Sequence, residues 1–266
     1  MLSIFQYDFM QKAFLVAILI SIIAPCIGVV IVLKRLSNIG DATSHSALAG
    51  IAFGLMVGIN PILGAIIFSL FAVMSIEGFR RAFGKYAEIS TSVVMSAGVG
   101  LTAVFSGFIK SSTNLNSFLF GSIVAISDFE LYLTVGLCII VIIASYLLYK
   151  ELFYITFDEE AAYLTGMPVR GINFVFMVLT AITVSVASRT VGALMVSSLM
   201  VIPVACAMMI AKSYKQTFIY SVIFAFCFTI SGLFLSYYLD LKPGGTIVLI
   251  GVVVLIILMF ANRNKN

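Results

Sequence analysis

Apolar stretches about as long as a lipid bilayer is thick recur along this chain, separated by short polar breaks. A helix crosses the hydrocarbon core with about 20 consecutive apolar residues, and its backbone polar groups must be satisfied within the segment. The pattern predicts an all-α, polytopic helical membrane protein with about eight to nine transmembrane helices. We place the spans near residues 13–33, 39–58, 61–80, 89–109, 129–149, 171–188, 192–210, 217–237 and 246–261.

The composition agrees with this prediction. Hydrophobic residues make up 62% of the 266 positions and charged residues only 10%, whereas soluble domains carry about 25% charged residues. No polar segment is long enough for a soluble domain, so residues 1–266 are predicted to form a single transmembrane domain. The first apolar run has neither a basic stretch before it nor a small-residue cleavage site after it, which indicates a retained span.

The basic residues predict the orientation of the chain. Nine crossings place eleven of the fifteen Lys and Arg residues on one side of the membrane and four on the other. Because cytoplasmic loops carry the excess of Lys and Arg, the richer side is predicted to be cytoplasmic. The N-terminus is then outside and the C-terminus cytoplasmic. The net charge of +4 reflects this topology, and no nucleic-acid partner is expected.

Two other features give structural expectations. The four cysteines are far apart, without CxxC spacing, and each lies in an apolar run, so we interpret them as buried structural residues. The segment 111–127 is too short and too polar to cross the membrane. It is expected to enter the membrane as a re-entrant piece covered by neighbouring helices.

The largest predicted cytoplasmic insertion, residues 150–171, carries signals for a short helix at about 157–166. Thr156 and Glu159 are three residues apart and match a capping box at the start of this helix. Asp158 adds favourable negative charge to the first turn.

Gly166 and Pro168 mark the end of this short helix. Glycine can adopt the left-handed conformation that ends a helix, and proline prevents its continuation. A helix of about two turns has no stability of its own. It must therefore pack against the membrane domain or against a soluble partner.

Asp41 and His45, the single histidine of the chain, lie four residues apart in the second predicted span. On a helix these positions project from the same face. An aspartate at the centre of a span costs about 2.5–3.5 kcal/mol, so such a residue usually has a partner or an aqueous path. Asp41 is expected near the cytoplasmic end of its helix, which lowers this cost. The pair is either an interfacial carboxylate beside a core histidine, or a functional site.

A carboxylate and a neutral imidazole together suit zinc, manganese or ferrous iron. One helix offers two such ligands, and a dimer with two-fold symmetry would bring four ligands to its axis. We therefore interpret Asp41 and His45 as the ligands of a metal-transit site. The same helix carries a stripe of small residues that allows close helix packing, namely Ser46, Gly50, Gly54 and Gly58.

Two other functional classes need consideration. A proton-coupled secondary carrier could use Asp41 and His45 as a proton relay and would need no partner ATPase. An intramembrane metalloenzyme is disfavoured, because the chain has no HExxH motif and its single histidine leaves too few ligands. No phosphate-binding loop is recognisable. The chain is therefore not expected to be an enzyme or to hold a permanent cofactor.

The chain resembles the permease subunit of the zinc/manganese/iron class of ATP-binding-cassette importers. Five motifs, spread over most of the chain, carry this resemblance. They are KRLSNIGDATSHSALAGIAFG (34–54), LNSFLFGSIVAIS (115–127), DEEAAYLTGMPVRGIN (158–173), SRTVGALMVSSLMVIPVACA (188–207) and PGGTIVL (243–249).

The resemblance implies a dimer of permeases, with a homodimer favoured, in the plasma or inner membrane of a cell. It also implies two cytoplasmic ATP-binding subunits docked on the short cytoplasmic helix, and an extracytoplasmic protein that delivers the metal. Asp41 and His45 match the family's transit ligands. The segment that couples to the ATPase is marked by Asp158, Glu159, Gly166 and Pro168.

Residues 46–54 resemble zinc-type members more than manganese-type members, so zinc is the favoured cargo and manganese or ferrous iron the alternative. The chain departs from the family pattern at two positions. Glu159 stands where proline is common, which could alter how the coupling helix begins. Gly244 stands where serine is usual.

Overall fold

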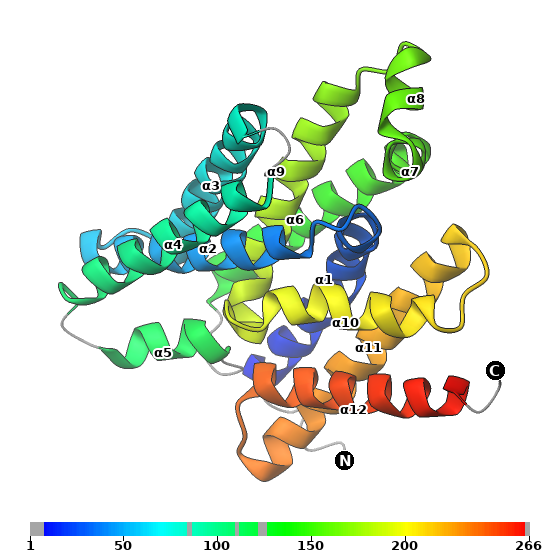
Figure 1. Ribbon diagram of the computed structural model, residues 1–266. Helices are drawn as coiled ribbons and strands as arrows, with labels where there is room; N and C mark the ends of the chain where they lie inside the picture. Colours follow the sequence, from blue (N-terminus) through cyan, green and yellow to red (C-terminus); the bar gives the residue numbers. More distant parts are fainter. Residues whose placement is uncertain (1–7, 84–86, 110–111, 122–126, 264–266) are drawn as a thin grey trace.

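The computed structural model describes residues 8–83, 87–109, 112–121 and 127–263, and every element in these ranges is a helix (Figure 1). The predicted all-α class is confirmed. The elements are α1 (Asp8–Leu33), α2 (Ser37–Val57), α3 (Pro61–Phe83), α4 (Ala87–Ser106), α5 (Ser112–Phe120), α6 (Asp128–Leu147), α7 (Tyr149–Phe157), α8 (Glu159–Leu164), α9 (Val169–Ala187), the π-helical turn η3 (Ser188–Gly192), α10 (Val196–Met208), α11 (Tyr214–Leu239) and α12 (Pro243–Arg263).

Seven helices in the described part of the chain are long and apolar enough to cross a membrane: α1, α3, α4, α6, α9, α11 and α12. The two other predicted spans differ from these in distinct ways. α2 has 21 residues, but its serines, glycines and ionisable residues make it less apolar. α10 has 13 residues and begins four residues later than the predicted span 192–210, because the turn η3 and residues 193–195 precede it.

Long-range contacts gather the helix ends into two sets. Lys12 pairs with Asp128 at the first end of the bundle, where α1 and α6 begin. At the second end, the rings of Tyr149 and Tyr214 lie 5.5 Å apart, which places the start of α7 beside the start of α11. Asn262, near the end of α12, donates to a carbonyl group just after α10. These contacts place the start of α1 at the first end of the bundle and the end of α12 at the second end.

The helices pack in two groups. In one group, α2, α3 and α4 pack closely together. In the other, α1 packs against α6, α10 and α11. α9 joins the groups through contacts with α1, α2 and α3 (Figure 1). The larger apolar core surrounds α1, which is buried along most of its length. A smaller core, which includes Ile39, Val73 and Ile76, lies between α2, α3, α4 and α9.

Glycines let α2 approach its neighbours at backbone distance. A Cβ at Gly50 would lie 2.2 Å from the carbonyl oxygen of Gly64 on α3, which leaves no space for a side chain. Gly58 ends α2 in the left-handed conformation, with φ of 81°, and its N–H donates to the carbonyl of Gly54. The predicted small-residue stripe thus packs α2 on α3 and then terminates the helix.

Three motifs that are far apart in the sequence meet at η3. Gly192 has φ of 96°, and a Cβ there would lie 2.5 Å from the backbone nitrogen of Gly121. A Cβ at Gly244, the first turn of α12, would lie 1.8 Å from the carbonyl oxygen of Val191. α5 has nine residues and spans about 14 Å at 1.5 Å per residue, too short to cross a bilayer. Residues 111 and 122–126 of the predicted re-entrant piece lie outside the described residues.

The cysteine prediction holds for three of the four residues. Cys26, Cys138 and Cys206 are buried, and all four thiols are free. Cys227 is exposed on α11, so its predicted burial was wrong. An apolar stretch alone could not distinguish the outer face of a membrane helix from its packed face, because both are apolar.

Candidate functional site

Asp41 and His45 lie on an open face of α2. Asp41 is exposed and His45 is half-buried, whereas the three residues between them, Ala42, Thr43 and Ser44, are buried. Because an α-helix has 3.6 residues per turn, the two side chains are one turn apart on one face. The other described residues leave Asp41 exposed and His45 half-buried on that face.

The polar side chains on the two sides of α2 differ in their hydrogen-bond partners. Neither the Asp41 nor the His45 side chain forms a hydrogen bond or ion pair with another described residue. On the buried side, the hydroxyl groups of Thr43 and Ser46 donate to carbonyl groups one turn earlier, at 2.7 and 2.9 Å, while that of Ser44 has no partner. The carboxylate and the imidazole therefore keep their donor atoms available for a ligand.

One chain offers an incomplete set of metal ligands. Within the described ranges, no three His, Cys, Asp or Glu residues lie close enough together to hold a metal ion. Asp41 and His45 supply one oxygen donor and one nitrogen donor group, whereas protein zinc sites use three or four protein ligands. The pair can complete a site of this kind only with donors from another molecule.

Two close contacts set the position of this part of α2. A Cβ at Gly98 of α4 would lie 2.9 Å from the backbone nitrogen of Ser46 and 3.0 Å from the carbonyl carbon of His45. A Cβ at Gly40 would lie 3.2 Å from the hydroxyl oxygen of Ser197 on α10. Sequence reasoning missed both contacts, because a glycine in an apolar run does not reveal which helix approaches it.

An apolar groove of about 390 Å³ between α3 and α4 reaches α2 at Ser46 and Ala49. Ser46 follows His45 directly, so it points about 100° further around the helix. The residues that line the groove include no carboxylate and no imidazole. This groove is therefore a surface distinct from the Asp41 and His45 face.

The short cytoplasmic helix that we predicted at about 157–166 corresponds to α8, Glu159–Leu164. Asp158 is its N-cap residue, and the carboxylate accepts a hydrogen bond of 2.9 Å from the backbone N–H of Ala161. Gly166 has φ of 84°, the left-handed conformation that the sequence predicted. Pro168 directly precedes the first residue of α9. α8 packs against α7 and α9, as so short a helix requires.

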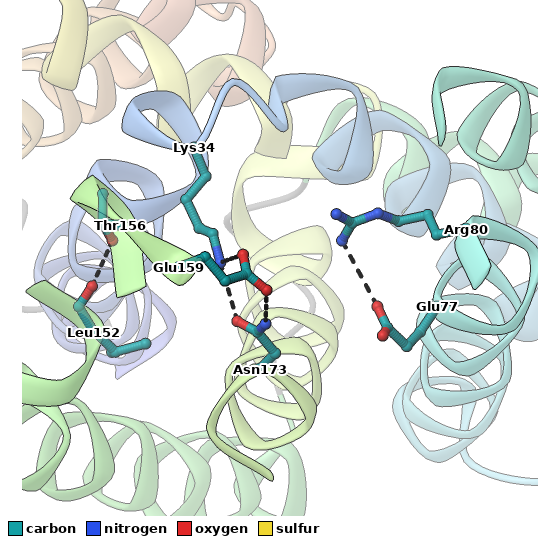
Figure 2. A network of polar contacts seen from close by, with 7 residues as sticks. All are labelled: Lys34, Glu77, Arg80, Leu152, Thr156, Glu159 and Asn173. Atoms are coloured by element: carbon teal, nitrogen blue, oxygen red, sulfur yellow. Dashed lines mark hydrogen bonds and ion pairs between the residues drawn. The ribbon is translucent and has the colours of Figure 1, made fainter. Parts of the chain in front are cut away.

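The predicted capping box at Thr156 was wrong. Thr156 lies inside α7, which continues to Phe157, and its hydroxyl group bonds to the carbonyl of Leu152 (Figure 2). Glu159 is the first residue of α8 and does not close a box onto Thr156. The physical reason is that α7 extends through the expected start of the next helix, so the cap moves to Asp158.

Glu159 instead takes part in a three-residue contact ring with Lys34 and Asn173 (Figure 2). The Lys34 ammonium lies 3.1 Å from the Glu159 carboxylate and donates to the Asn173 side-chain oxygen at 3.0 Å. The Asn173 amide donates to Glu159 at 2.9 Å. The contact ring joins the end of α1 to the starts of α8 and α9.

The contact ring is partly shielded from water. The side chain of Lys34 is 11% exposed and that of Glu159 is 46% exposed. Burial lowers the pKa of Lys34, and the nearby Glu159 opposes this effect by favouring the charged lysine. Sequence reasoning missed Lys34 and Asn173, although both lie in the quoted motifs 34–54 and 158–173, because 139 residues separate them.

Two named bacterial proteins are similar to almost the whole chain. The "Probable metal transport system membrane protein" of Treponema pallidum (strain Nichols) is 35% identical over 256 residues, which cover 96% of each chain. The "Manganese import system permease protein ScaB" of Streptococcus parasanguinis is 32% identical over 255 residues, which cover 96% of this chain and 91% of that protein.

A solved structure and a family model agree with these sequence similarities. The chain is similar to the solved structure "PsaBC from Streptococcus pneumoniae in complex with Fab", with a TM-score of 0.85 and 30% identity over 95% of this chain and 91% of that one. The model of the ABC 3 transport family matches residues 6–262. The chain therefore belongs to the ABC 3 transport family and is a multi-pass permease of the cell membrane that serves the import of divalent metal ions.

Proposed function

We propose that two copies of this chain form the membrane path of an ATP-driven importer, in which Asp41 and His45 of each copy hold the metal ion during transit. The observation that carries this proposal is the open face of α2. These two side chains are free of partners among the described residues, whereas the opposite side of the helix is buried against α3 and α4. Two copies facing each other would supply two carboxylates and two imidazoles.

Manganese is the cargo that we propose to test first. The relative from Streptococcus parasanguinis is named for manganese import, and the one from Treponema pallidum for metal transport in general. Carboxylate oxygens suit manganese, while imidazole is shared by several metals. This choice replaces the preference for zinc that residues 46–54 suggested, and zinc becomes the competing cargo.

α8 is the proposed docking point for a cytoplasmic ATP-binding subunit. Tyr163 and Leu164 are 65% and 84% exposed on α8, which projects from the helix bundle (Figure 1). They line a hollow of about 580 Å³ together with Glu160 and Arg170. The second end of the bundle then faces the cytoplasm, and an extracytoplasmic metal-binding protein delivers the ion at the first end.

Movement of α8 would reach the transit site through Lys34. The contact ring attaches Glu159 of α8 to the end of α1, and three residues connect this end to the start of α2. α2 then carries Asp41 within its first two turns. A displacement of α8 during ATP binding would thus pull on the helix that holds the metal ligands.

The proposal is tested by Asp41→Asn and His45→Gln, which keep side-chain size and remove a metal-binding group. Cells that lack other importers would express each variant together with its ATP-binding subunit, and uptake of radioactive manganese would be measured. We expect each variant to lose uptake by at least about 10- to 100-fold, the loss typical even of groups that only hold a metal ligand in place. Met56→Ala, an exposed change on the same helix, is the control and should retain uptake.

The same cells separate the cargo ions and the energy source. An excess of unlabelled zinc should compete less well than unlabelled manganese if manganese is the preferred cargo. An ATP-binding subunit that cannot hydrolyse ATP should abolish uptake, whereas a proton-coupled carrier would continue to work. Uptake at the normal level by both Asp41→Asn and His45→Gln would overturn the site assignment.

A further inference from the structure

A groove of about 440 Å³ lies between α6 and α11, on the surface of α1. Cys26 of α1 belongs to its floor, and Ile142 of α6 and Ile219 of α11 belong to its walls. The polar lining residues are Ser145, Tyr146, Tyr149 and Lys215. The groove is therefore apolar along its length, with a basic and phenolic end.

The position of the groove indicates that it faces lipid, an argument that rests on the proposed function. If the open face of α2 meets a second copy, the side of the bundle remote from α2 is left to the bilayer. α6 and α11 both pack on α1, whereas α2 packs mainly on α3 and α4 (Figure 1). The groove thus opens into the hydrocarbon region of the bilayer, where lipid acyl chains surround the protein.

The polar end of the groove lies at the second end of the bundle. Lys215 is in the first turn of α11, and Tyr149 begins α7. Lys215 is exposed and forms no ion pair with another residue in the described ranges. Tyrosine and lysine side chains favour the level of the lipid headgroups, and the cytoplasmic leaflet carries the anionic lipids. An anionic headgroup therefore matches the charge at this end.

Ser145 provides an independent sign of a polar group in the groove. It is 8% exposed, and its hydroxyl oxygen has no hydrogen-bond partner. Buried hydroxyl groups such as those of Thr180 and Ser221 donate to a carbonyl group one turn earlier, whereas those of Ser44, Ser90, Thr183 and Thr229 share the unpaired state of Ser145. Among these unpaired hydroxyl groups, that of Ser145 is the one that lines the groove. An unpaired hydroxyl is costly in an apolar setting, and the ester carbonyl of a glycerolipid is a suitable acceptor.

We propose that this groove binds one anionic phospholipid of the cytoplasmic leaflet. One acyl chain lies between α6 and α11, the ester region lies near Ser145, and the phosphate lies near Lys215 and the phenol of Tyr149. Tyr149 also packs against Tyr214 and Phe218, with ring centroids 5.5 and 6.1 Å away. The lipid thus abuts the aromatic residues that hold the start of α7.

The test is native mass spectrometry of the full-length permease, purified in detergent and titrated with phosphatidylglycerol or phosphatidylcholine. We expect one phosphatidylglycerol per chain to remain bound, about fivefold more often than phosphatidylcholine, as one lysine contact near the membrane surface allows. Lys215→Gln should remove this preference. Lys212→Gln removes the same charge just outside the groove and should leave the preference unchanged.

Ser145→Phe tests the groove without a change of charge. The larger side chain fills the space between α6 and α11, so retention of both lipids should fall, and a retained thermal midpoint would show that the variant is folded. Added inorganic phosphate should not displace the lipid, because it lacks acyl chains. Equal retention of the two lipids by the wild type, or a wild-type preference in Lys215→Gln, would overturn the proposal. Wild-type retention by Ser145→Phe or displacement of the lipid by phosphate would also overturn it. Because no metal is involved in this measurement, its result is independent of the transit site.

Discussion

The open face of α2 and the contact ring at the start of α9 treat charged groups in opposite ways. Asp41 and His45 have no partner among the described residues, while Lys34, Glu159 and Asn173 satisfy one another at 2.9–3.1 Å. A group that binds and releases a passing ion must not be held by its own protein. A group that transmits movement must be held by such contacts. We therefore expect stability and transport to respond differently to changes in the two regions.

Gly98→Ala is expected to have the largest effect on stability, because it disturbs the support of the open face. The added Cβ would lie 2.9 Å from the backbone of Ser46, so α2 and α4 must separate. Overpacking of this kind costs about 1–3 kcal/mol. Thermal unfolding can be followed with a thiol-reactive dye that labels buried cysteines as they become exposed, in a Cys227→Ser background.

Gly100→Ala is the matched control for Gly98→Ala. Gly100 lies on the same helix two residues later, and a Cβ there would meet no atom within 4 Å. Its thermal midpoint should be unchanged or slightly raised, because alanine favours helix. Manganese uptake should fall in Gly98→Ala and persist in Gly100→Ala. Equal midpoints for the two variants would contradict the close contact between α4 and α2.

Lys34→Met tests the contact ring and is expected to cost about 1–2 kcal/mol. Removal of the ammonium leaves Glu159 and Asn173 without their shared partner, but Glu159 is partly exposed and water can replace part of the interaction. The informative measurement is the ratio of metal uptake to ATP hydrolysis in the assembled transporter. We expect hydrolysis to continue while uptake falls, because the link between α8 and α1 is lost.

Lys150→Met is a suitable control for Lys34→Met. Lys150 is exposed on α7, outside the contact ring, so its replacement should leave the ratio of uptake to hydrolysis unchanged. A Lys34→Met variant that lost uptake and hydrolysis in equal proportion would argue that the contact ring supports the fold alone.

The helices could be predicted from the sequence because the bilayer imposes a length and a composition on each of them. The full length of the break before α10 could not be predicted in this way. Gly192 adopts φ of 96°, and Ala193 donates to a carbonyl of α5, a contact between segments about 75 residues apart in the chain. A hydropathy pattern records the local sequence and contains no information about such contacts, so residues 192–195 were assigned to the predicted span 192–210.

The candidate site was visible in the sequence for a related reason. Ionisable residues inside apolar runs are rare and costly, so Asp41 and His45 stand out without any knowledge of the fold. Lys34 lies at a helix end, where lysine is common and carries little information. Its contact with Glu159 depends on the folding of α8 against α9, which no local pattern contains.

Asp158→Ala tests the cap of α8 and should have a smaller effect than Lys34→Met. Loss of the hydrogen bond to the Ala161 N–H costs about 1 kcal/mol for the segment. Because α8 is short and peripheral, we expect little change in the global thermal midpoint and weaker co-purification of the ATP-binding subunit. Asp158→Asn, which can still cap the helix, should preserve that association. Loss of association in both variants would indicate that the charge, and not the cap, is required.

Asp41→Asn is expected to have the smallest effect on stability, although it should have the largest effect on uptake. The carboxylate forms no hydrogen bond or ion pair with another described residue, so its loss removes no contact within the chain. Removal of a charge from a membrane helix also lowers the cost of burying that helix. The free energy of unfolding should therefore stay within about 0.5 kcal/mol of wild type, or rise. A decrease comparable to that of Lys34→Met would mean that Asp41 supports the fold, and the contrast between the two regions would be lost.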